Sequence, residues 1–312
     1  MFIKTSSKNQ IINNINQSAG NPIGGSSETI RKLSEKDIDW LAGVLDGDGN
    51  FDIINIKNCT TPNGSIITTR RALKQIRITQ HPRDGRILYR VKEILGGSIK
   101  PKGKKYLIWT ISTKSQMIYC LNLINGKIRL KVPGFKEACL LTNITYIQAN
   151  YKIERNSGYL SGLTDTDGSI VLNYPSNRIE LNLEFNDNEY SSAIDFSEVI
   201  PGAKLSTLKL IKRNQTQEKI FYSIRFSYNT VENMRPLYEY FLLNRLYSDF
   251  KFYRAMQIKR FLELRAYHNH PKDSPEFLLY YNFIKNFVTH LNEHKAPPVY
   301  LKTNMETIKP IK

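Results

Sequence analysis

Residues 40–53, WLAGVLDGDGNFDI, and residues 159–172, YLSGLTDTDGSIVL, are two copies of one motif. Both copies read aromatic-Leu-small-Gly-apolar-x-Asp-x-Asp-Gly-x-apolar, and their first residues lie 119 positions apart. A repeat at this long spacing is typical of two similar domains rather than of a solenoid. The motif therefore predicts a chain built from two related halves.

The segments that follow each copy repeat one order of elements. In the first half the patterns predict strands over 50–57 and 73–80, a helix over 83–95, short strands around the basic turn 100–105, and helices over 113–124 and 134–149. The second half repeats this order with strands near 169–174 and 178–185, a helix near 188–199, strands near 204–212 and 219–228, and helices near 230–243, 248–267 and 275–293.

This order predicts an α+β fold of two pseudo-symmetric αββαββα halves with extra helices at the C-terminal end. The first half is expected over residues 34–150 and the second over 151–295. We expect residues 1–33, which are rich in Ser and Asn, to form a disordered leader, and residues 296–312 to form a tail.

The composition indicates a polyanionic partner. Lys and Arg number 45 against 28 Asp and Glu, so the formal net charge is +17. The hydrophobic fraction of 40% supports a buried core, and no apolar run approaches the ~18 residues of a membrane helix. The chain is rich in Ile, Asn, Lys, Tyr and Phe, whose codons are AT-rich, which indicates a genome such as the mitochondrial one.

Small residues in the motif predict how the two halves meet. Ser34 suits the N-cap of a helix over 35–46, and the equivalent helix carries the second copy. Ala42 with Gly43, and Ser161 with Gly162, let two helix backbones approach closely. We expect the motif helices to pack on each other about a pseudo-twofold axis.

That packing would place Asp48 and Asp167 side by side at two helix C-termini. An anion there is disfavoured by roughly 0.3–1 kcal/mol, and two neighbouring carboxylates also repel each other. A cation between them would offset both effects, and oxygen ligands suit Mg²⁺ or Mn²⁺ with phosphate oxygens completing the shell. A single copy could equally be a helix end followed by a turn, but the second copy favours the metal site.

These residues carry a family resemblance. Residues 41–49, LAGVLDGDG, and 160–168, LSGLTDTDG, resemble the LAGLIDADG signature, and residues 34–295 resemble the monomeric, two-motif homing endonucleases of that family, often encoded in organellar group I introns. The resemblance implies a DNA-binding saddle of two four-stranded antiparallel sheets with the motif helices at the interface. It also implies Mg²⁺- or Mn²⁺-dependent cleavage of both strands of a long asymmetric DNA site, leaving 3′ overhangs.

The resemblance also implies roles for individual residues. Asp48 and Asp167 correspond to the metal ligands, and the carbonyls of Gly47 and Thr166 would also face the metal. The family uses one basic residue in each half to polarise the water network. The candidates are Lys251 in the second half and Lys127 in the first, with Lys131 as a rival; a phosphate contact or a solvated charge is the alternative for each.

Polar positions on the predicted strands suit the reading of base edges in a major groove. One strand face would carry Gln75, Arg77 and Thr79, and the equivalent faces in the second half would carry Arg178, Glu180, Asn182 and Arg225. The alternative is a solvated polar face. Basic segments would hold phosphates, with Lys102 and Lys104 in one turn and Lys209 and Arg213 in one strand.

Two other functions use the same features. An intron RNA maturase, which assists group I splicing, would need the same positive charge, and one protein could perform both functions. A DNA-binding regulator with a decayed site should have lost at least one of Asp48 and Asp167, and this chain has both. Double-stranded DNA is therefore the expected partner, with group I intron RNA as the second.

Overall fold

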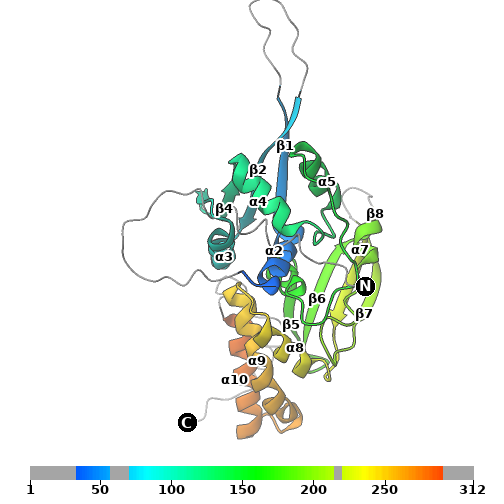
Figure 1. Cartoon of the computed structure of the whole chain (residues 1–312). Coiled ribbons are helices and arrows are strands. Elements are labelled where there is room, and N and C mark those ends of the chain that lie inside the picture. Colours follow the sequence, from blue (N-terminus) through cyan, green and yellow to red (C-terminus); the bar gives the residue numbers. More distant parts are fainter. Residues whose placement is uncertain (1–32, 57–69, 214–219, 291–312) are drawn as a thin grey trace, which may run out of the picture. The chain divides into compact units, whose positions relative to one another are not determined.

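The computed structural model describes residues 33–56, 70–213 and 220–290. Its order of elements follows the predicted repeat of the two halves (Figure 1). The predicted tail, and the predicted leader except for Leu33, fall outside the described residues.

The first motif lies on α2 (Glu35–Asp48), which begins at a capping box. The Ser34 side chain accepts a hydrogen bond from the Asp37 backbone N–H, and the Asp37 carboxylate accepts one from the Ser34 backbone N–H. Residues Trp40 to Asp46 are all buried, because this helix contacts protein on more than one side. The second motif lies on α6 (Tyr159–Thr166), which is buried from Tyr159 to Asp165.

The first sheet contains β1 (Gly49–Ile56), β2 (Arg70–Gln80), β3 (Ser98–Lys102) and β4 (Tyr106–Ile111), in the antiparallel order β1-β2-β4-β3. Its apolar face carries Ile76, Ile78 and Trp109, all fully buried. The helix α3 (Gly85–Leu95) contacts three of these strands, and α5 (Val132–Leu141) contacts β1 and β2. The helix α4 (Lys114–Ile124) packs against α2, α3 and α5.

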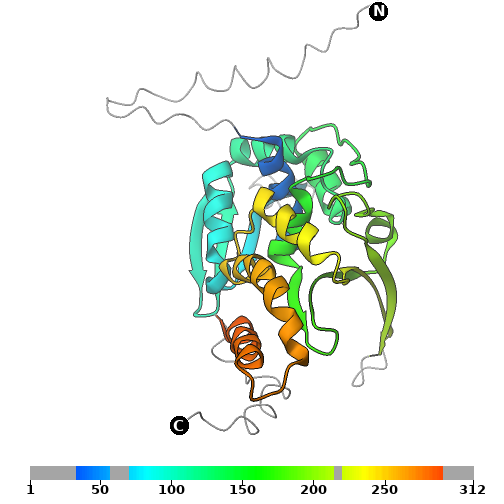
Figure 2. The same cartoon turned by 90° about the horizontal axis from the view of Figure 1, so that it is seen from below.

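The second sheet repeats this arrangement with β5 (Ser169–Asn173), β6 (Arg178–Asn186), β7 (Ser206–Arg213) and β8 (Ile220–Tyr228), in the order β5-β6-β8-β7. The helix α8 (Met234–Leu243) contacts β6. The helices α9 (Asp249–Leu264) and α10 (Pro275–Thr289) pack against each other after it, drawn in orange and orange-red in Figure 2. The two antiparallel four-stranded sheets confirm the predicted α+β fold. Within the described residues, no helix is long and apolar enough to cross a membrane.

Two predicted helices are shorter than expected. The helix predicted over 134–149 is α5, and it ends because Asn143 adopts a left-handed backbone with φ 58°. The helix predicted over 188–199 is α7 (Glu189–Ala193) alone. Beyond it, Asp195 pairs instead with the segment that joins the two halves: its N–H donates to Tyr151 O, and its carbonyl accepts from Ile153 N–H.

Candidate functional site

The two motif helices touch through their glycines. A Cβ added to Gly43 would lie 2.3 Å from Tyr159 O, and one added to Gly162 would lie 2.1 Å from Trp40 O. Real Cβ atoms do not approach backbone oxygens so closely, so this crossing requires glycine in both helices. The predicted packing of α2 on α6 is confirmed.

The crossing brings the C-terminal ends of α2 and α6 together. Asp48 is the last residue of α2, and Asp167 is the C-cap of α6. A Cβ on Gly47 would lie 3.1 Å from Asp167 Oδ2, which shows how near the two helix ends are. Asp48 is half-buried, whereas Asp167 presents more of its surface to solvent. We call these two residues the aspartate pair.

The aspartate pair is electrostatically strained. Desolvation of its carboxyl group raises the pKa of Asp167 to about 6, and the negative charge of Asp48 adds to the increase. Desolvation also raises the pKa of Asp48, against the lowering effects of a hydrogen bond and two lysines. Both carboxylates therefore lie where additional positive charge would be favourable.

Gln80 contacts one member of the pair, and the sequence interpretation missed it. Its Nε2 donates a 2.7 Å hydrogen bond to Asp48 Oδ2. The available signal was its position, because Gln80 follows Ile76 and Ile78 on the apolar side of β2 and is itself buried. The strand registers place Phe185 at the equivalent position of the second half.

Lys251, a candidate from the sequence, lies beside the aspartate pair. Its Nζ donates hydrogen bonds to the carbonyls of Thr164, Asp165 and Thr166, at 2.9, 2.8 and 2.8 Å. These carbonyls form the negative end of α6, which an ammonium group stabilises. Desolvation lowers the pKa of Lys251, and nearby aspartates oppose that change.

Lys131 occupies the corresponding place in the first half. Its Nζ donates to the carbonyl of Gly47 and, at 2.5 Å, to the carbonyl of Gly49. Desolvation lowers its pKa, while the charges of Asp48 and Asp167 raise it. The two lysines thus occupy matching positions at the ends of the two motif helices.

Lys127 lies elsewhere. Its Nζ forms ion pairs with Glu35 and Asp39 at the start of α2. Glu35 is the first residue of α2 and Asp48 the last, so roughly 20 Å of helix separates them. The structure therefore does not bring Lys127 to the aspartate pair. It places the rival, Lys131, there instead.

The donor set fits a hard divalent cation. Two carboxylates and the nearby carbonyls of Gly47 and Thr166 are all oxygen donors, which Mg²⁺ and Mn²⁺ prefer. Within the described residues no hydrogen bond to the Asp167 carboxylate is found, and no group of three His, Cys, Asp or Glu residues could hold a metal ion. Each carbonyl already accepts from a lysine but has a second lone pair.

The polar face of the first sheet gathers the predicted strand residues. The buried positions Ile76 and Ile78 alternate with Gln75, Arg77 and Thr79, which therefore share the other face. The registers place Lys102 on this same face, where it is exposed, and Lys104 is exposed in the adjoining turn. Gln75 already has a hydrogen-bond partner, because its Nε2 donates to Asp52 Oδ2 at 2.8 Å.

The polar face of the second sheet is paired internally. Arg178 forms a 2.7 Å ion pair with Glu180, which is buried, and Arg225 forms a 2.8 Å ion pair with Glu184. Asn182 accepts from the hydroxyl of Ser227 at 2.6 Å. The predicted residues of this face are brought together, but their polar groups already have partners.

Lys209 lies on the other side of the second sheet. In the strand register Lys209 lies opposite Ile224, whose side chain is in the core, so both side chains lie on the same side of the sheet. Lys209 also forms an ion pair with Asp187 at 3.0 Å. The side chain of Arg213, the other predicted phosphate contact on this strand, falls outside the described residues. Lys209 therefore does not lie on the face that carries Asn182 and Arg225.

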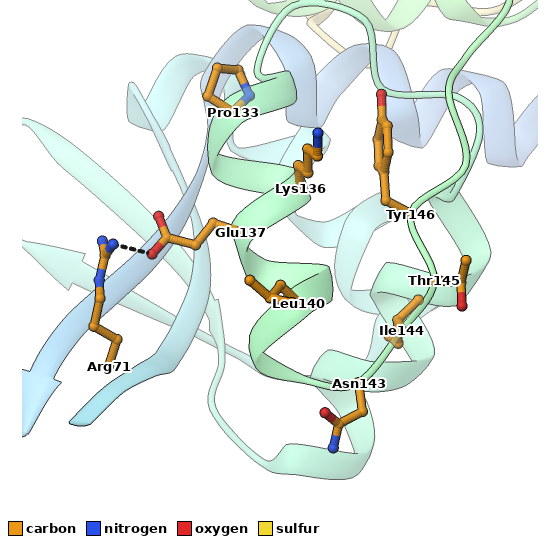
Figure 3. A pocket seen from close by; sticks show the side chains of 9 residues that line it. All are labelled: Arg71, Pro133, Lys136, Glu137, Leu140, Asn143, Ile144, Thr145 and Tyr146. Carbon is orange, nitrogen blue, oxygen red and sulfur yellow. Dashed lines mark ion pairs between the residues drawn. The ribbon is translucent and has the colours of Figure 1, made fainter.

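A cavity of about 700 Å³ lies on the first half, away from the aspartate pair. Figure 3 shows it between α5 and residues 143–146, with the 2.5 Å ion pair of Arg71 and Glu137 on one side. Its lining includes neither Asp48 nor Asp167. The carboxylates therefore do not belong to this cavity.

One known family model matches part of the chain. The family model described as "LAGLIDADG endonuclease" matches residues 41–129, which include the first motif, Gln80 and Lys127. Over these residues the chain is similar to LAGLIDADG endonucleases. Its second motif, at residues 160–168, supplies the other half of the interface.

Curated relatives of this chain are named as intron-encoded proteins. It is 27% identical over 221 residues to the "Intron-encoded RNA maturase bI4" of Saccharomyces cerevisiae, covering 67% of this chain and 32% of the relative. It is 29% identical over 214 residues to the "Intron-encoded DNA endonuclease ai2b" of Dictyostelium discoideum, covering 66% and 72% respectively. The chain thus spans about a third of the yeast relative's length.

Solved LAGLIDADG structures share the fold. "I-SmaMI bound to uncleaved DNA target in the presence of Calcium ions" aligns with a TM-score of 0.54 and 13% identity, over 82% of this chain and 99% of that one. The "I-LtrWI LAGLIDADG homing endonuclease bound to target DNA" aligns with a TM-score of 0.52 and 10% identity, over 81% and 98%.

Proposed function

We propose that this chain is a site-specific DNA endonuclease that acts in intron homing, depends on Mg²⁺ or Mn²⁺, and cleaves both strands of a long asymmetric target to leave 3′ overhangs. One observation carries the proposal: Asp48 and Asp167 lie together at two packed helix ends, and each end has its own lysine. That arrangement costs free energy in the absence of a cation, so a purely structural role does not explain it.

The residues divide the reaction between the two halves. Asp48 and Asp167, with the carbonyls of Gly47 and Thr166, would hold the metal. When bound, the metal supplies activation of water and stabilisation of the leaving 3′ oxygen. We assign Lys131, in place of Lys127, and Lys251 to the polarisation of water at the two scissile phosphates. Their ammonium groups are held in position by the helix-end carbonyls.

The sheets would provide DNA recognition. The polar faces carry Gln75, Arg77 and Thr79 in one half and Arg178, Asn182 and Arg225 in the other, which suits base edges in a major groove. The net charge of +17 suits a polyanion. The Dictyostelium relative is named a DNA endonuclease, and the aligned structures contain DNA targets.

We further propose that the protein acts as a monomer in mitochondria, with the halves divided between residues 150 and 151. The internal repeat already supplies two motif helices, so a second chain is not required for the aspartate pair. The relatives named as intron-encoded support an organellar origin, together with the AT-rich codon usage that the composition indicates.

Assistance to group I splicing is the second candidate function. The specific observation in its favour is the yeast relative, which is named an RNA maturase. The same positive charge would serve intron RNA as well as DNA.

A cleavage assay tests the proposed function. Purified wild-type protein and Asp48→Asn are incubated with intron-less organellar DNA from a close relative, with and without Mg²⁺. We expect one discrete cut with 3′ overhangs for the wild type, and binding without cutting for Asp48→Asn. Equal cutting by both proteins would refute the metal-site assignment. No cutting, with tight binding to structured intron RNA, would instead favour the maturase.

A further inference from the structure

The first aspartate of each motif has a different role from the second. Asp46 is buried at 2% exposure, and it points away from the aspartate pair toward the loop before α5. Its carboxylate accepts hydrogen bonds from the backbone N–H groups of Arg129, Leu130 and Lys131, at 2.6, 3.0 and 2.8 Å. Asp46 therefore fixes the backbone from which the Lys131 side chain extends.

Asp165 does the same in the second half. It is buried at 1% exposure, and its carboxylate accepts from the backbone N–H groups of Tyr247 and Ser248, both at distances from 2.8 to 3.0 Å. Ser248 is the N-cap of α9, and its hydroxyl accepts from the N–H of Lys251. Asp165 thus fixes the helix start that carries Lys251.

Each of these aspartates also bonds across the interface between the halves. The hydroxyl of Tyr159, on α6, donates to Asp46 Oδ2 at 2.7 Å. The indole Nε1 of Trp40, on α2, donates to Asp165 Oδ2 at 2.9 Å. Trp40 and Tyr159 are the equivalent first residues of the two motif copies, so the two bonds are related by the repeat.

We propose that Asp46 and Asp165 are positioning residues. Each one links the packing of the opposite half to the position of the catalytic lysine in its own half. Tyr159 on α6 holds Asp46 and so Lys131, and Trp40 on α2 holds Asp165 and so Lys251. A half-site is then complete only when the other half is docked, which couples the two cutting events. The placement of the two lysines rests on geometry alone, whereas their role in cleavage rests on the proposed function.

Chemical labelling tests the positioning without requiring nuclease activity. The full-length protein is treated with limiting acetic anhydride, and acetylation of Lys131 and Lys251 is quantified by mass spectrometry. We expect Tyr159→Phe to raise the labelling of Lys131 about fivefold, the factor that one net hydrogen bond contributes, with Lys251 unchanged. Trp40→Phe should raise the labelling of Lys251 alone.

The control is Tyr240→Phe, which also removes one buried tyrosine hydroxyl. The Tyr240 hydroxyl donates to Ser157 O at 2.6 Å and accepts from Ser161 N–H at 3.1 Å. Within the described residues it forms no hydrogen bond with Asp46 or Asp165, so the labelling of both lysines should stay at the wild-type level. Asp46→Asn is the stronger variant, because an amide group cannot accept three N–H donors as a carboxylate does. If it fails to fold, Tyr159→Phe still decides. Labelling that rises equally at both lysines, or at neither, would overturn the proposal.

Strand-resolved cleavage extends the test to catalysis. A target duplex labelled differently on its two strands is cut by each variant under single-turnover conditions. We expect Tyr159→Phe to slow cleavage of one strand and Trp40→Phe to slow cleavage of the other. DNA binding should stay close to wild type, because neither side chain lies on the faces proposed to contact DNA. General loss of stability would slow both strands together and contradict the assignment. If the wild type cuts no DNA, the proposed function fails, while the labelling result still decides the positioning.

Discussion

The backbones of Gly43 and Gly162 are in direct contact: a Cβ on Gly43 would lie 3.1 Å from Gly162 Cα, and one on Gly162 would lie 3.0 Å from Gly43 Cα. This contact brings the ends of α2 and α6 together. The placement of Asp48 beside Asp167 therefore depends on glycine, which has no side chain, at both positions about one turn earlier.

Gly43→Ala should destabilise the protein, because the new methyl group would meet the carbonyl of Tyr159 and force the helices apart. Overpacking of this kind costs about 1–3 kcal/mol of folding free energy. Urea unfolding of the variant and the wild type measures this loss. The matched control is Gly134→Ala on α5, where the nearest atom to a Cβ is Phe51 Cδ2 at 3.8 Å. Alanine there should raise stability by up to about 1 kcal/mol. Equal effects at both positions would contradict the close crossing.

Lys131→Met should reduce single-turnover cleavage strongly, by about a hundredfold or more for loss of a group acting in general acid–base chemistry. DNA affinity should change little, because one cation among many is removed. Lys127→Met is the matched control: it removes ion pairs with Glu35 and Asp39 and should cost at most about 1 kcal/mol of stability. Cleavage by Lys127→Met should stay near wild type. The reverse ranking of the two variants would return the role to Lys127.

Gln80→Met should slow cleavage about tenfold to a hundredfold, the equivalent of losing one hydrogen bond to a charged group. Without the Nε2 donor, the pKa of Asp48 should rise further and its carboxylate should lose its orientation. Gln75→Met is the comparison. Gln75 lies on the same strand as Gln80 but on its opposite face, and it also donates to an aspartate, Asp52 on β1. That variant should weaken DNA binding and leave the rate of the bound complex intact.

Asp167→Asn should abolish cleavage and yet stabilise the metal-free protein. Folding raises the pKa of the Asp167 carboxyl group to about 6. The folded protein therefore loses stability as the pH rises from the pKa of the unfolded state toward 6, and the full loss is present above pH 6. Asp167 is partly exposed, so the gain at pH 7.5 should be about 1 kcal/mol after solvent screening. The difference in thermal stability from wild type should shrink as the pH falls from 6 to 4. A variant less stable than wild type at pH 7.5 would show that repulsion in the aspartate pair is negligible.

Glu184→Gln should strengthen non-specific DNA binding. The substitution removes the carboxylate that pairs with Arg225 at 2.8 Å, so the guanidinium becomes available to phosphate. One additional phosphate contact should steepen the slope of log Kobs against log salt by about 0.9. Glu198→Gln is charge-matched and breaks the ion pair with Lys152, which lies outside both sheets. It should leave the slope unchanged, and a common change in both variants would indicate net charge alone.

Local patterns were sufficient to predict most of the fold and the aspartate pair. Helix caps such as Ser34, alternation such as that of Ile76 and Ile78, and the two motif copies are all properties of nearby residues, and they determine where elements begin and which face is apolar. The repeat then required the copies to be equivalent. Glycine at positions 43 and 162 permits the close approach of the two helices, which places Asp48 beside Asp167.

The partners of that pair were decided by tertiary structure. Whether Lys127 or Lys131 reaches the C-terminal end of α2 depends on the loop that Asp46 holds through three backbone N–H groups. The two lysines are only four residues apart in the sequence, so local patterns do not distinguish them. Gln80 contacts Asp48 only because β2 passes the end of α2. The ion pair between Arg225 and Glu184 likewise depends on strand register, which is set by long-range pairing. The sequence alone thus determined the halves and their two carboxylates, whereas contacts between distant segments decided which side chains act on them.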